Sequence, residues 1–397
     1  MSPRETLSRV EPLLAGFGIT RVARHTGLDD IGIPVWCAYA PNSRSIVIAQ
    51  GKGLTDLDAK VSTVMEALER AVAGEPSVDL VHATSLRLQA MGHKTDTLDC
   101  LTALHRPDLG PDEETEWVAG VNILTGDEVY IPFEAVVLDR TRDARYWMSS
   151  DGLASGNNVE EAIFHGVLER IERDAHVLWQ VGRDADRYAG CVDPRGFRDG
   201  ALDGLIDKIE TSGLALKLFD ITSDIGIPCF TAMLGPEDLI AGRRAFHGDR
   251  DIRLVDVTGG TGAHSSPVRA AIRAVTEAVQ SRLTYISGAR DDISPSTFSR
   301  CLPPLMRQAF DAVAAPPAAA IGSGRAALHR QQDLAHLLQD VLDRLRNRRI
   351  ASVIAVRLSD DTLPFSVVKV VIPELENPEG ERARRLGTRA LARAIGF

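Results

Sequence analysis

Three stretches of this chain repeat one pattern, in which a glycine-rich segment leads into a helix with paired polar residues. The stretches start near residues 51, 156 and 262, and they superimpose through the alanines at 59, 162 and 270. Seven residues after each alanine stands a glutamate, and three residues later a second glutamate or a glutamine. In chain order the pairs are Glu66 and Glu69, Glu169 and Glu172, and Glu277 and Gln280. Because residues three apart share a helix face, each unit presents two oxygen-bearing side chains together.

A glycine precedes each helix of the repeat. Gly53 and Gly156 stand thirteen residues before the first glutamate of their units, whereas Gly262 stands fifteen before. A glycine-rich loop before a helix lets backbone N–H groups approach a phosphate, with the helix dipole in support. Lys52 is either a further phosphate contact or an exposed turn lysine. Taken together, the units predict a nucleotide site in which several carboxylates hold more than one Mg²⁺. The alternative is three unrelated amphipathic helices, because Glu-x-x-Glu spacing is common.

The second of these helices, predicted over 158–179, is strongly acidic on one side. Its polar face carries Glu161, His165, Glu169 and Glu172 within about 80° of arc. Apolar residues cover most of the other faces, so the acidic stripe is expected to lie inside the protein. Buried carboxylates at neighbouring positions repel each other unless cations lie between them. The alternative is a solvent-exposed acidic face with Asn158 as N-cap and Glu161 closing a capping box.

The remaining pattern predicts an α+β protein. Strands are expected at 33–39, 45–49, 117–124, 128–132, 214–221, 228–233, 350–358 and 365–372. Helices are expected from Thr55 to Ala73, near 202–209, at 268–286 and 328–346, and at the basic C-terminus. The Ala-, Pro- and Gly-rich segment 312–327 is typical of a linker or a mobile loop. The turn sequence Thr125-Gly126-Asp127 favours a hairpin between two of these strands, and mixed or antiparallel sheets are expected around the three loop-helix units.

Composition excludes several classes of protein. The 397-residue chain carries a net charge of −10, which argues against nucleic-acid binding but suits a protein that gathers divalent metals. Its five cysteines have no paired spacing, so neither a zinc knuckle nor a disulfide framework is expected. No window resembles a membrane helix or a signal peptide. A cytoplasmic protein is therefore expected.

Standard catalytic and nucleotide motifs do not occur. The chain contains no Gly-x-x-x-x-Gly-Lys-Ser/Thr, no Rossmann glycine pattern and no nucleophile elbow. His165 and His264 serve either in acid/base chemistry or as structural hydrogen-bonding groups.

Five segments carry a resemblance to a known family. They are Gly51-Lys-Gly-Leu-Thr55, the run from Ser62 to Arg70, Ser150-Asp-Gly-Leu-Ala-Ser-Gly-Asn157, the run from Thr276 to Thr284, and Val370-Val-Ile-Pro-Glu-Leu-Glu376. In combination they resemble the YcaO family over roughly residues 45–376. The last segment is similar to the family's Pro-Gly-Leu-Glu signature, with Glu374 in place of glycine. The resemblance divides the chain into an N-terminal segment (1–44), a YcaO domain with the YcaO-type fold (45–376) and a C-terminal helix (377–397).

The resemblance implies an enzyme that uses ATP and Mg²⁺ to activate a peptide backbone amide by O-phosphorylation. Attack by a neighbouring Cys, Ser or Thr side chain of a ribosomal peptide gives an azoline, whereas external sulfide gives a thioamide. Carried over by position, the nucleotide would contact Ser62, Glu66, Asn157, Glu161, Arg173, Glu277 and Gln280, with Lys52 as a further candidate. The metals would be held by Glu66, Glu69, Glu169, Glu172 and Glu277.

Two departures from azoline-forming members favour thioamide formation. The sequence ends Arg-Ala-Ile-Gly-Phe397, without their proline-rich tail, and the segments 51–55 and 280–284 are similar to members that work with a TfuA partner. No separate leader-binding domain is evident, so a TfuA-like partner is expected to help recognise a peptide or protein substrate. The alternatives are an azoline-forming cyclodehydratase and a non-catalytic ATP-binding scaffold. The substrate, the sulfur source and the formation of a homodimer stay open.

Overall fold

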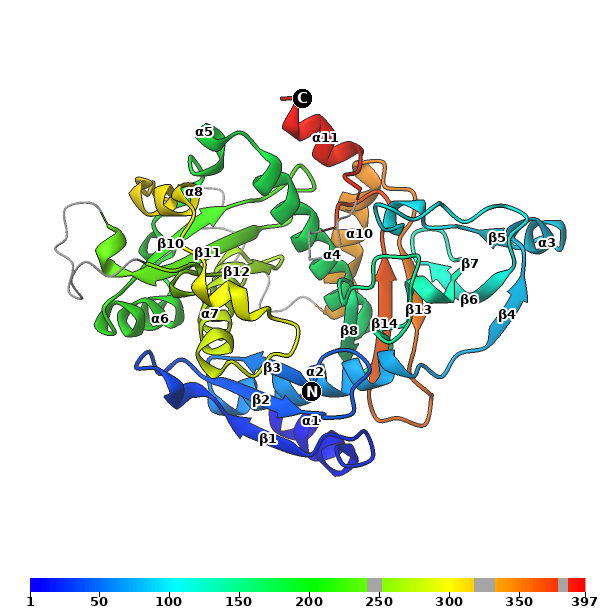
Figure 1. The fold of residues 1–397 in the computed structure, drawn as a ribbon, viewed down its shortest axis with the longest axis horizontal. Coiled ribbons are helices and arrows are strands. Elements are labelled where there is room, and N and C mark those ends of the chain that lie inside the picture. The colour runs from blue at the N-terminus through cyan, green and yellow to red at the C-terminus, as the bar shows by residue number, and fades with distance from the viewer. Residues whose placement is uncertain (241–251, 318–332, 378–384, 397) are drawn as a thin grey trace.

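A computed structural model describes residues 1–240, 252–317, 333–377 and 385–396, which fold into three sheets with helices packed between and around them (Figure 1). The N-terminal sheet has the order β1-β2-β3 and is antiparallel. Its strands are β1 (Arg21–Arg24), β2 (Val35–Tyr39) and β3 (Ile48–Lys52). Helices α1 (Pro3–Val10) and α2 (Asp56–Gly74) lie side by side, and α2 covers one face of this sheet. Pairing of β2 with β3 runs across the domain boundary predicted at residue 45.

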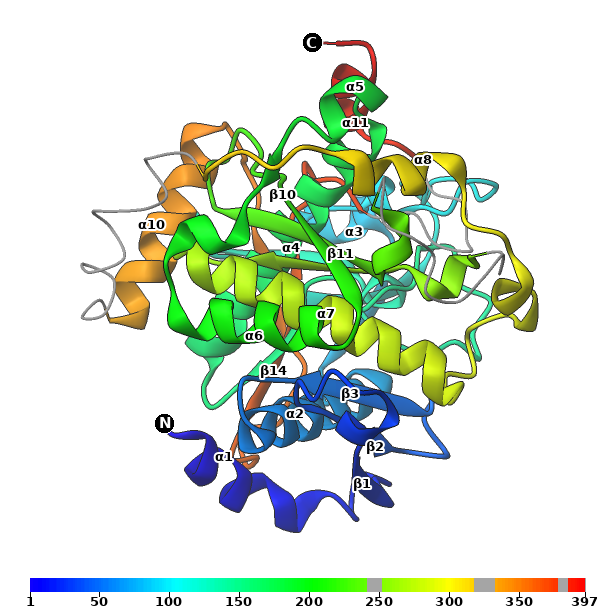
Figure 2. The ribbon, with the colours of Figure 1, turned by 90° about the vertical axis from the view of Figure 1, so that its left-hand side faces the viewer.

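The second sheet is antiparallel, with the order β12-β11-β10-β9. Its strands are β9 (Cys191–Val192), β10 (Leu214–Asp220), β11 (Cys229–Pro236) and β12 (Thr258–Ala263). Helices α6 (Gly200–Thr211) and α7 (Pro267–Ser287) pack together on it, as Figure 2 shows. The short helices α5 (Asp184–Arg187) and α8 (Pro304–Gln308) complete this region.

The third sheet has seven strands, in the order β5-β7-β6-β13-β14-β8 with β4 also paired to β6. They are β4 (Leu80–Ala83), β5 (Lys94–Thr95), β6 (Thr115–Asn122), β7 (Asp127–Pro132), β8 (Leu153–Gly156), β13 (Ile354–Arg357) and β14 (Ser366–Val371). Only β5 with β7 is a parallel pair among the described strands. The remaining helices are α3 (Ser85–Ala90), α10 (Leu334–Asn347) and α11 (Thr388–Ala394). The predicted α+β class with mixed or antiparallel sheets is confirmed.

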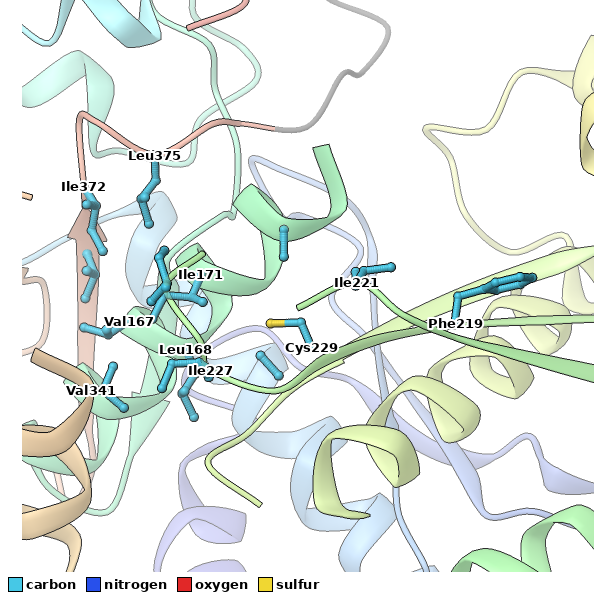
Figure 3. Packing of buried hydrophobic residues seen from close by; sticks show 14 of the residues in the cluster. Val167, Leu168, Ile171, Phe219, Ile221, Ile227, Cys229, Val341, Ile372 and Leu375 are labelled. Atoms are coloured by element: carbon cyan, nitrogen blue, oxygen red, sulfur yellow. The ribbon is translucent and has the colours of Figure 1, made fainter. Parts of the chain in front are cut away.

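Helix α4 (Val159–Val181) lies between the second and third sheets (Figure 1). Its apolar side packs into a buried cluster in which Val167, Leu168 and Ile171 meet Ile227 of the second sheet's β10–β11 connection and Ile372 next to β14 (Figure 3). Burial of such side chains contributes about 1.5–3 kcal/mol each. This packing fixes the rotation of α4. Of its predicted acidic stripe, Glu169 and Glu172 face the interior between the sheets, whereas His165 is exposed to solvent, so the expectation that the whole stripe lies inside is wrong. No helix among the described residues has both the length and the apolarity to cross a membrane.

The sequence pattern missed six of the described strands and misplaced the glycines. β1, β4, β5 and β9 are short and lack a clear alternation of apolar residues, so none of them was predicted. β8 and β12 lie in segments that were expected to be loops. The segments expected to be glycine-rich loops are mainly strands: Gly51 lies in β3, Gly156 ends β8, and Gly262 lies in β12. The loop prediction is therefore wrong for these positions. The expected linker and the start of the helix predicted at 328 fall partly outside the described residues.

The glycines allow a helix backbone to pack directly on a strand. A Cβ at Gly51 would lie 2.1 Å from the backbone N of Thr63, and one at Gly262 would lie 2.3 Å from the backbone O of Ala270. Cβ atoms at Gly53 and Gly156 would each lie 2.6 Å from the N of an alanine of the repeat. Gly262 contacts residues eight and twelve positions later, as Gly51 does. Gly262 is thus the structural equivalent of Gly51 and not of Gly53. Gly51 also stands fifteen residues before the first glutamate of its unit, which explains the spacing of Gly262.

The three strand-helix units close into a ring. Helix α2 packs against β8 of the second unit, α4 packs against β12 of the third, and α7 packs against β3 of the first. Each of β3, β8 and β12 is the end strand of its sheet. The three sheets therefore contribute one edge strand each to a common centre, and the paired polar residues of the helices lie around it.

Candidate functional site

Hydrogen bonds connect helices of the ring to the strand of the next unit. Glu69 of α2 accepts a hydrogen bond from Ser155 Oγ of β8 at 3.0 Å. Glu172 of α4 accepts from Ala263 N of β12 at 2.9 Å and from Thr261 Oγ1 at 2.8 Å. Ser155 and Ala263 occupy equivalent positions of the repeat, seven residues before its alanine. Two units therefore make the same connection from the second carboxylate of the helix to the next strand.

The third connection differs because Gln280 replaces the second glutamate. Lys52, the equivalent of Ser155 on β3, donates instead to Glu277 Oε2, the first carboxylate of its unit. Its side chain is only 19% exposed, so Lys52 is not the exposed turn lysine of the alternative reading. Burial raises the pKa of Glu277, but Lys52 and Arg173 together hold it down at about 2. Glu277 is therefore an anion at every physiological pH.

Arg173 connects three carboxylates at the centre of the site. Its Nε lies 3.1 Å from Asp151 Oδ1, Nη2 lies 3.2 Å from Glu169 Oε1, and Nη1 lies 3.5 Å from Glu172 Oε1. Burial raises the pKa of Glu169 to about 7, with Asp151 and Glu172 adding repulsion that Arg173 only partly offsets. The arrangement concentrates more negative charge than one guanidinium neutralises.

The carboxylates of α2 repel one another in the same way. Glu66 accepts from Arg70 Nε at 3.0 Å and keeps 29% of its side chain exposed. Burial raises the pKa of Glu69 well above its ordinary value, and the neighbouring Glu66 and Glu169 raise it further. Glu69 is therefore close enough to the carboxylates of both α2 and α4 to interact with them.

A second group of predicted residues lies at the start of α4. Asn157 Nδ2 donates to Glu161 at 3.1 and 3.2 Å, and Thr6 Oγ1 of α1 donates to Asn157 Oδ1 at 2.9 Å. Asn158 caps the helix by accepting from Glu161 N at 2.8 Å, as predicted. The carboxylate of Glu161 accepts from the backbone N of Asn157 and not of Asn158, so the capping-box alternative is wrong. Two further predicted residues, Ser62 (exposed) and Gln280 (half-buried), lie at repeat positions on α2 and α7.

The carboxylates are candidates for metal ligands on their chemistry. Among the described residues, no group of three His, Cys, Asp or Glu side chains is close enough to hold a metal ion as the side chains stand. Cations contact the carboxylates instead: Arg173 lies among Asp151, Glu169 and Glu172, Lys52 contacts Glu277, and Arg70 contacts Glu66. Mg²⁺ takes carboxylate oxygens together with substrate phosphates, and the raised pKa values of Glu69 and Glu169 indicate that further positive charge beside these two carboxylates would be favourable. The residues present therefore fit Mg²⁺.

Several polar residues of the site were missed from sequence. Lys369 of β14 is 5% exposed, and its Nζ donates to Ser149 O and Asp151 O at 2.6 and 2.8 Å. Burial lowers the pKa of Lys369 to about 8. This lysine holds the backbone that presents Asp151 to Arg173. Asp151 lies inside the family-like segment 150–157, and Lys369 stands just before the segment 370–376. Their closeness to these segments is the feature of the sequence that could have identified them as site residues.

The two histidines singled out from sequence have modest contacts. His165 is exposed to solvent, and its Nδ1 lies 3.4 Å from Ser155 O. His264 Nδ1 accepts from Ser266 N at 2.9 Å, which supports a structural role for this ring.

His176, one turn after Glu172, makes stability depend on pH. Burial and the nearby Arg173 lower its pKa to about 4, whereas an unfolded histidine titrates near 6.5. Between these values the unfolded chain binds a proton that the native chain does not, so stability falls as pH falls. We expect His176→Phe, which keeps the ring beside Trp179, to reduce the loss of unfolding free energy between pH 7 and 5 by about 2 kcal/mol.

Denaturant titrations of both proteins at the two pH values measure this effect. Equal losses of unfolding free energy for the wild type and His176→Phe would contradict a partly buried His176 that stays neutral in the native protein.

Three end strands around a buried, carboxylate-rich centre define an α+β protein suited to metal-dependent phosphate chemistry. A family model described as "YcaO cyclodehydratase, ATP- and Mg²⁺-binding" matches residues 50–376, and the chain belongs to this family. ATP and Mg²⁺ are the cofactors of the family, as expected from the sequence.

Relatives of the chain agree with this assignment. An uncharacterised protein in the tfuA 3′ region of Rhizobium leguminosarum bv. trifolii is 38% identical over 98% of this chain and 91% of its own length. An uncharacterised protein of Methanothermobacter thermautotrophicus is 34% identical over 75% of this chain and 74% of its own length.

Two solved structures share the fold. YcaO from Methanopyrus kandleri, bound with AMPPCP and Mg²⁺, has a TM-score of 0.72 and 23% identity over 98% of this chain and 95% of its own. A heterocyclase in complex with substrate and cofactor has a TM-score of 0.72 and 19% identity, over 95% of this chain and 52% of its own. The predicted YcaO-type fold is confirmed.

Proposed function

We propose that this chain is an ATP- and Mg²⁺-dependent enzyme that converts a peptide backbone amide into a thioamide. Hydrosulfide would add to the amide carbon, and the amide oxygen would take the γ-phosphoryl group of ATP with release of ADP. That oxygen would then leave as phosphate, while the sulfur loses its proton to the departing phosphate and C=S forms. Bound Mg²⁺-ATP would supply the phosphoryl group and the charge neutralisation that this transfer needs. The observation that carries the proposal is the set of mutually repelling carboxylates on α2, α4 and α7.

The chain's own residues would bind and orient the nucleotide and its metals. The proposed metal ligands are Glu66, Glu69, Glu169, Glu172 and Glu277. The proposed nucleotide contacts are Lys52, Ser62, Glu66, Asn157, Glu161, Arg173, Glu277 and Gln280. Thr6, which donates to Asn157, joins the second set as a positioning residue. Arg173 and Lys52 neutralise the carboxylates only in part when no ligand is bound, and on metal binding their cationic groups would become available to phosphate oxygens.

The similarity of this chain to the Rhizobium protein favours thioamide formation over azoline formation. The Rhizobium relative, 38% identical over nearly the whole chain, is described by its place in the tfuA 3′ region. We therefore propose that this chain also works with a TfuA-like partner that helps recognise the peptide or protein substrate. An azoline-forming activity remains the second candidate, because a heterocyclase shares the fold.

The mass of the product distinguishes the two reactions. We expect the peptide or protein encoded beside this chain, incubated with ATP, Mg²⁺, sulfide and any TfuA-like neighbour, to gain the mass difference between sulfur and oxygen. Intact-mass spectrometry measures the change, and omission of sulfide is the control. Loss of one water would indicate an azoline. ATP binding with no change in peptide mass would favour a non-catalytic scaffold.

A further inference from the structure

A small cavity is enclosed by α4, β14 and the segment that carries Asp151. Its volume is about 10 Å³, which is close to the space that one water-sized group needs. Apolar side chains such as Leu101 and Ile372 form part of the lining. The polar part of the lining comes from Trp147, Ser149, Asp151, Arg170, Lys369 and Asn377. The occupant of this cavity is therefore limited to a group with one heavy atom.

Two buried cations line the cavity without a carboxylate partner. Arg170 of α4 is 2% exposed, and Lys369 of β14 is 5% exposed. Among the described residues, neither has an Asp or Glu oxygen within 4.0 Å, whereas Arg173 and Arg389 each contact at least two carboxylates. Buried charges in proteins are normally paired, because an isolated charge is costly away from water. Arg170 and Lys369 therefore lack the counter-ion that their burial calls for.

Two N–H groups at the cavity also lack an acceptor. Nη1 of Arg170 and Nε1 of Trp147 are buried, and neither has a hydrogen-bond partner in the part of the chain that the structure describes. Nη2 of Arg170, by contrast, donates to the backbone O of Glu376 at 2.9 Å. Buried donors are nearly always paired, because an unpaired donor has lost its bonds to water without replacement. An acceptor inside the cavity would satisfy both N–H groups.

The acceptors of the lining are already occupied. Lys369 Nζ donates to Ser149 O and Asp151 O, and Ser149 Oγ donates to the Asp151 carboxylate. That carboxylate also lies 3.1 Å from Arg173 Nε, so the residue that lines the cavity belongs to the carboxylate centre as well. Two positive side chains, Arg170 and Lys369, against the one negative Asp151 leave the lining with a charge of +1.

We propose that this cavity binds one small monovalent anion, of the size of chloride or hydrosulfide, between Arg170, Lys369 and Trp147. The anion pairs with both buried cations and accepts from both free N–H groups. A water molecule would satisfy the N–H groups but would leave the two cations without a counter-ion. Phosphate and sulfate are too large for a cavity of about 10 Å³.

Two anions of this class are relevant to the enzyme. Chloride is supplied by the solution, and hydrosulfide is the nucleophile of the proposed reaction. The assignment of hydrosulfide to the cavity rests on the proposed function, whereas the anion site itself does not.

Thermal unfolding of the full-length protein in different salts tests the proposal. At constant ionic strength, replacement of gluconate, which is too large for the cavity, by chloride is expected to raise the Tm by about 2–4 °C. Sodium hydrosulfide in anaerobic buffer is expected to raise the Tm as well. A larger rise with hydrosulfide than with the same concentration of chloride supports the nucleophile as the occupant, and a smaller rise overturns that assignment.

Two variants of the lining separate this site from general salt effects. Lys369→Met removes one cation, so it is expected to abolish the rise in Tm. Trp147→Phe keeps a ring and removes one free N–H group, so the rise is expected to fall to about half or less. Trp36→Phe is the matched control, because Trp36 Nε1 donates to Asp56 at 3.0 Å, outside the cavity, and it is expected to keep the wild-type rise.

Equal Tm values of the wild type in gluconate and chloride would overturn the proposal and indicate water in the cavity. A wild-type rise in Trp147→Phe would also overturn it, and this variant decides the question alone if Lys369→Met does not fold. Because neither ATP nor peptide is present, failure of the proposed amide chemistry leaves these results unchanged, and the two failures are distinguishable.

Discussion

Glu172→Gln is expected to lower ATP hydrolysis by about 100-fold or more, because it removes charge from a proposed metal ligand. Glu172 is 3% exposed, and its two oxygens accept from Thr261 and Ala263 of the next unit. Glutamine has the same size and keeps one acceptor, so the change acts mainly on charge. We expect Glu66→Gln, at a half-exposed position on α2, to have an effect of the same order.

Phosphate release at saturating ATP, repeated over a series of Mg²⁺ concentrations, measures both variants. We expect the Mg²⁺ concentration for half-maximal rate to rise, since a ligand has been lost. Glu160→Gln is the matched control, because Glu160 is exposed at the start of the same helix as Glu172. Wild-type rates in both Glu172→Gln and Glu66→Gln would remove these residues from the proposed metal site.

Arg389→Met is expected to destabilise the protein by about 3 kcal/mol, since it leaves a buried carboxylate without its cation. Arg389 of α11 binds Asp174 of α4 through Nε and Nη2, both at 2.9 Å. Asp174 is fully buried, whereas Arg389 is 18% exposed. Asp174 also accepts from Glu376 N at 3.0 Å, a bond that the variant keeps. This pair attaches the C-terminal helix to the helix that carries Glu169 and Glu172.

Chemical denaturation at neutral and acid pH checks this prediction. Burial already raises the pKa of Asp174, and Arg389 opposes that rise. In the variant the native state therefore holds the proton more readily than the unfolded state, so the deficit in stability is expected to shrink as pH falls. Arg393→Ala, at an exposed arginine of the same helix, is expected to change stability by no more than about 0.5 kcal/mol. A deficit that grows in acid would contradict the assignment.

Local patterns predicted the units of the site well. Glutamates at i and i+3 on predicted helices identified the paired faces of α2 and α4, because helical periodicity fixes which residues share a face. Asn158 was predicted as the N-cap of α4 for a similarly local reason. These features depend on neighbours within about one or two turns, which the sequence contains directly.

The structural roles of the glycines could not be predicted from local patterns. Gly51 and Gly262 suggested phosphate-binding loops, yet both lie in strands where a Cβ would collide with a helix backbone. A glycine that serves a ligand and one that serves helix packing look alike in sequence, since both remove a side chain. Lys369 was missed for a related reason: a lysine in an apolar strand gives no indication of the carbonyls it meets.

The sequence by itself determined the family, the α+β class and the carboxylates that the repeat offers. Only the tertiary structure decided how the three units meet, with each helix on the strand of the next unit and Arg173 among Asp151, Glu169 and Glu172. It also decided that alanines of β2, β3 and α2 line a cavity of about 150 Å³ together with Arg70. Helical periodicity is a property of neighbouring residues, whereas the hydrogen bonds between units join residues 86 to 225 positions apart, and no local pattern encodes how such elements pack.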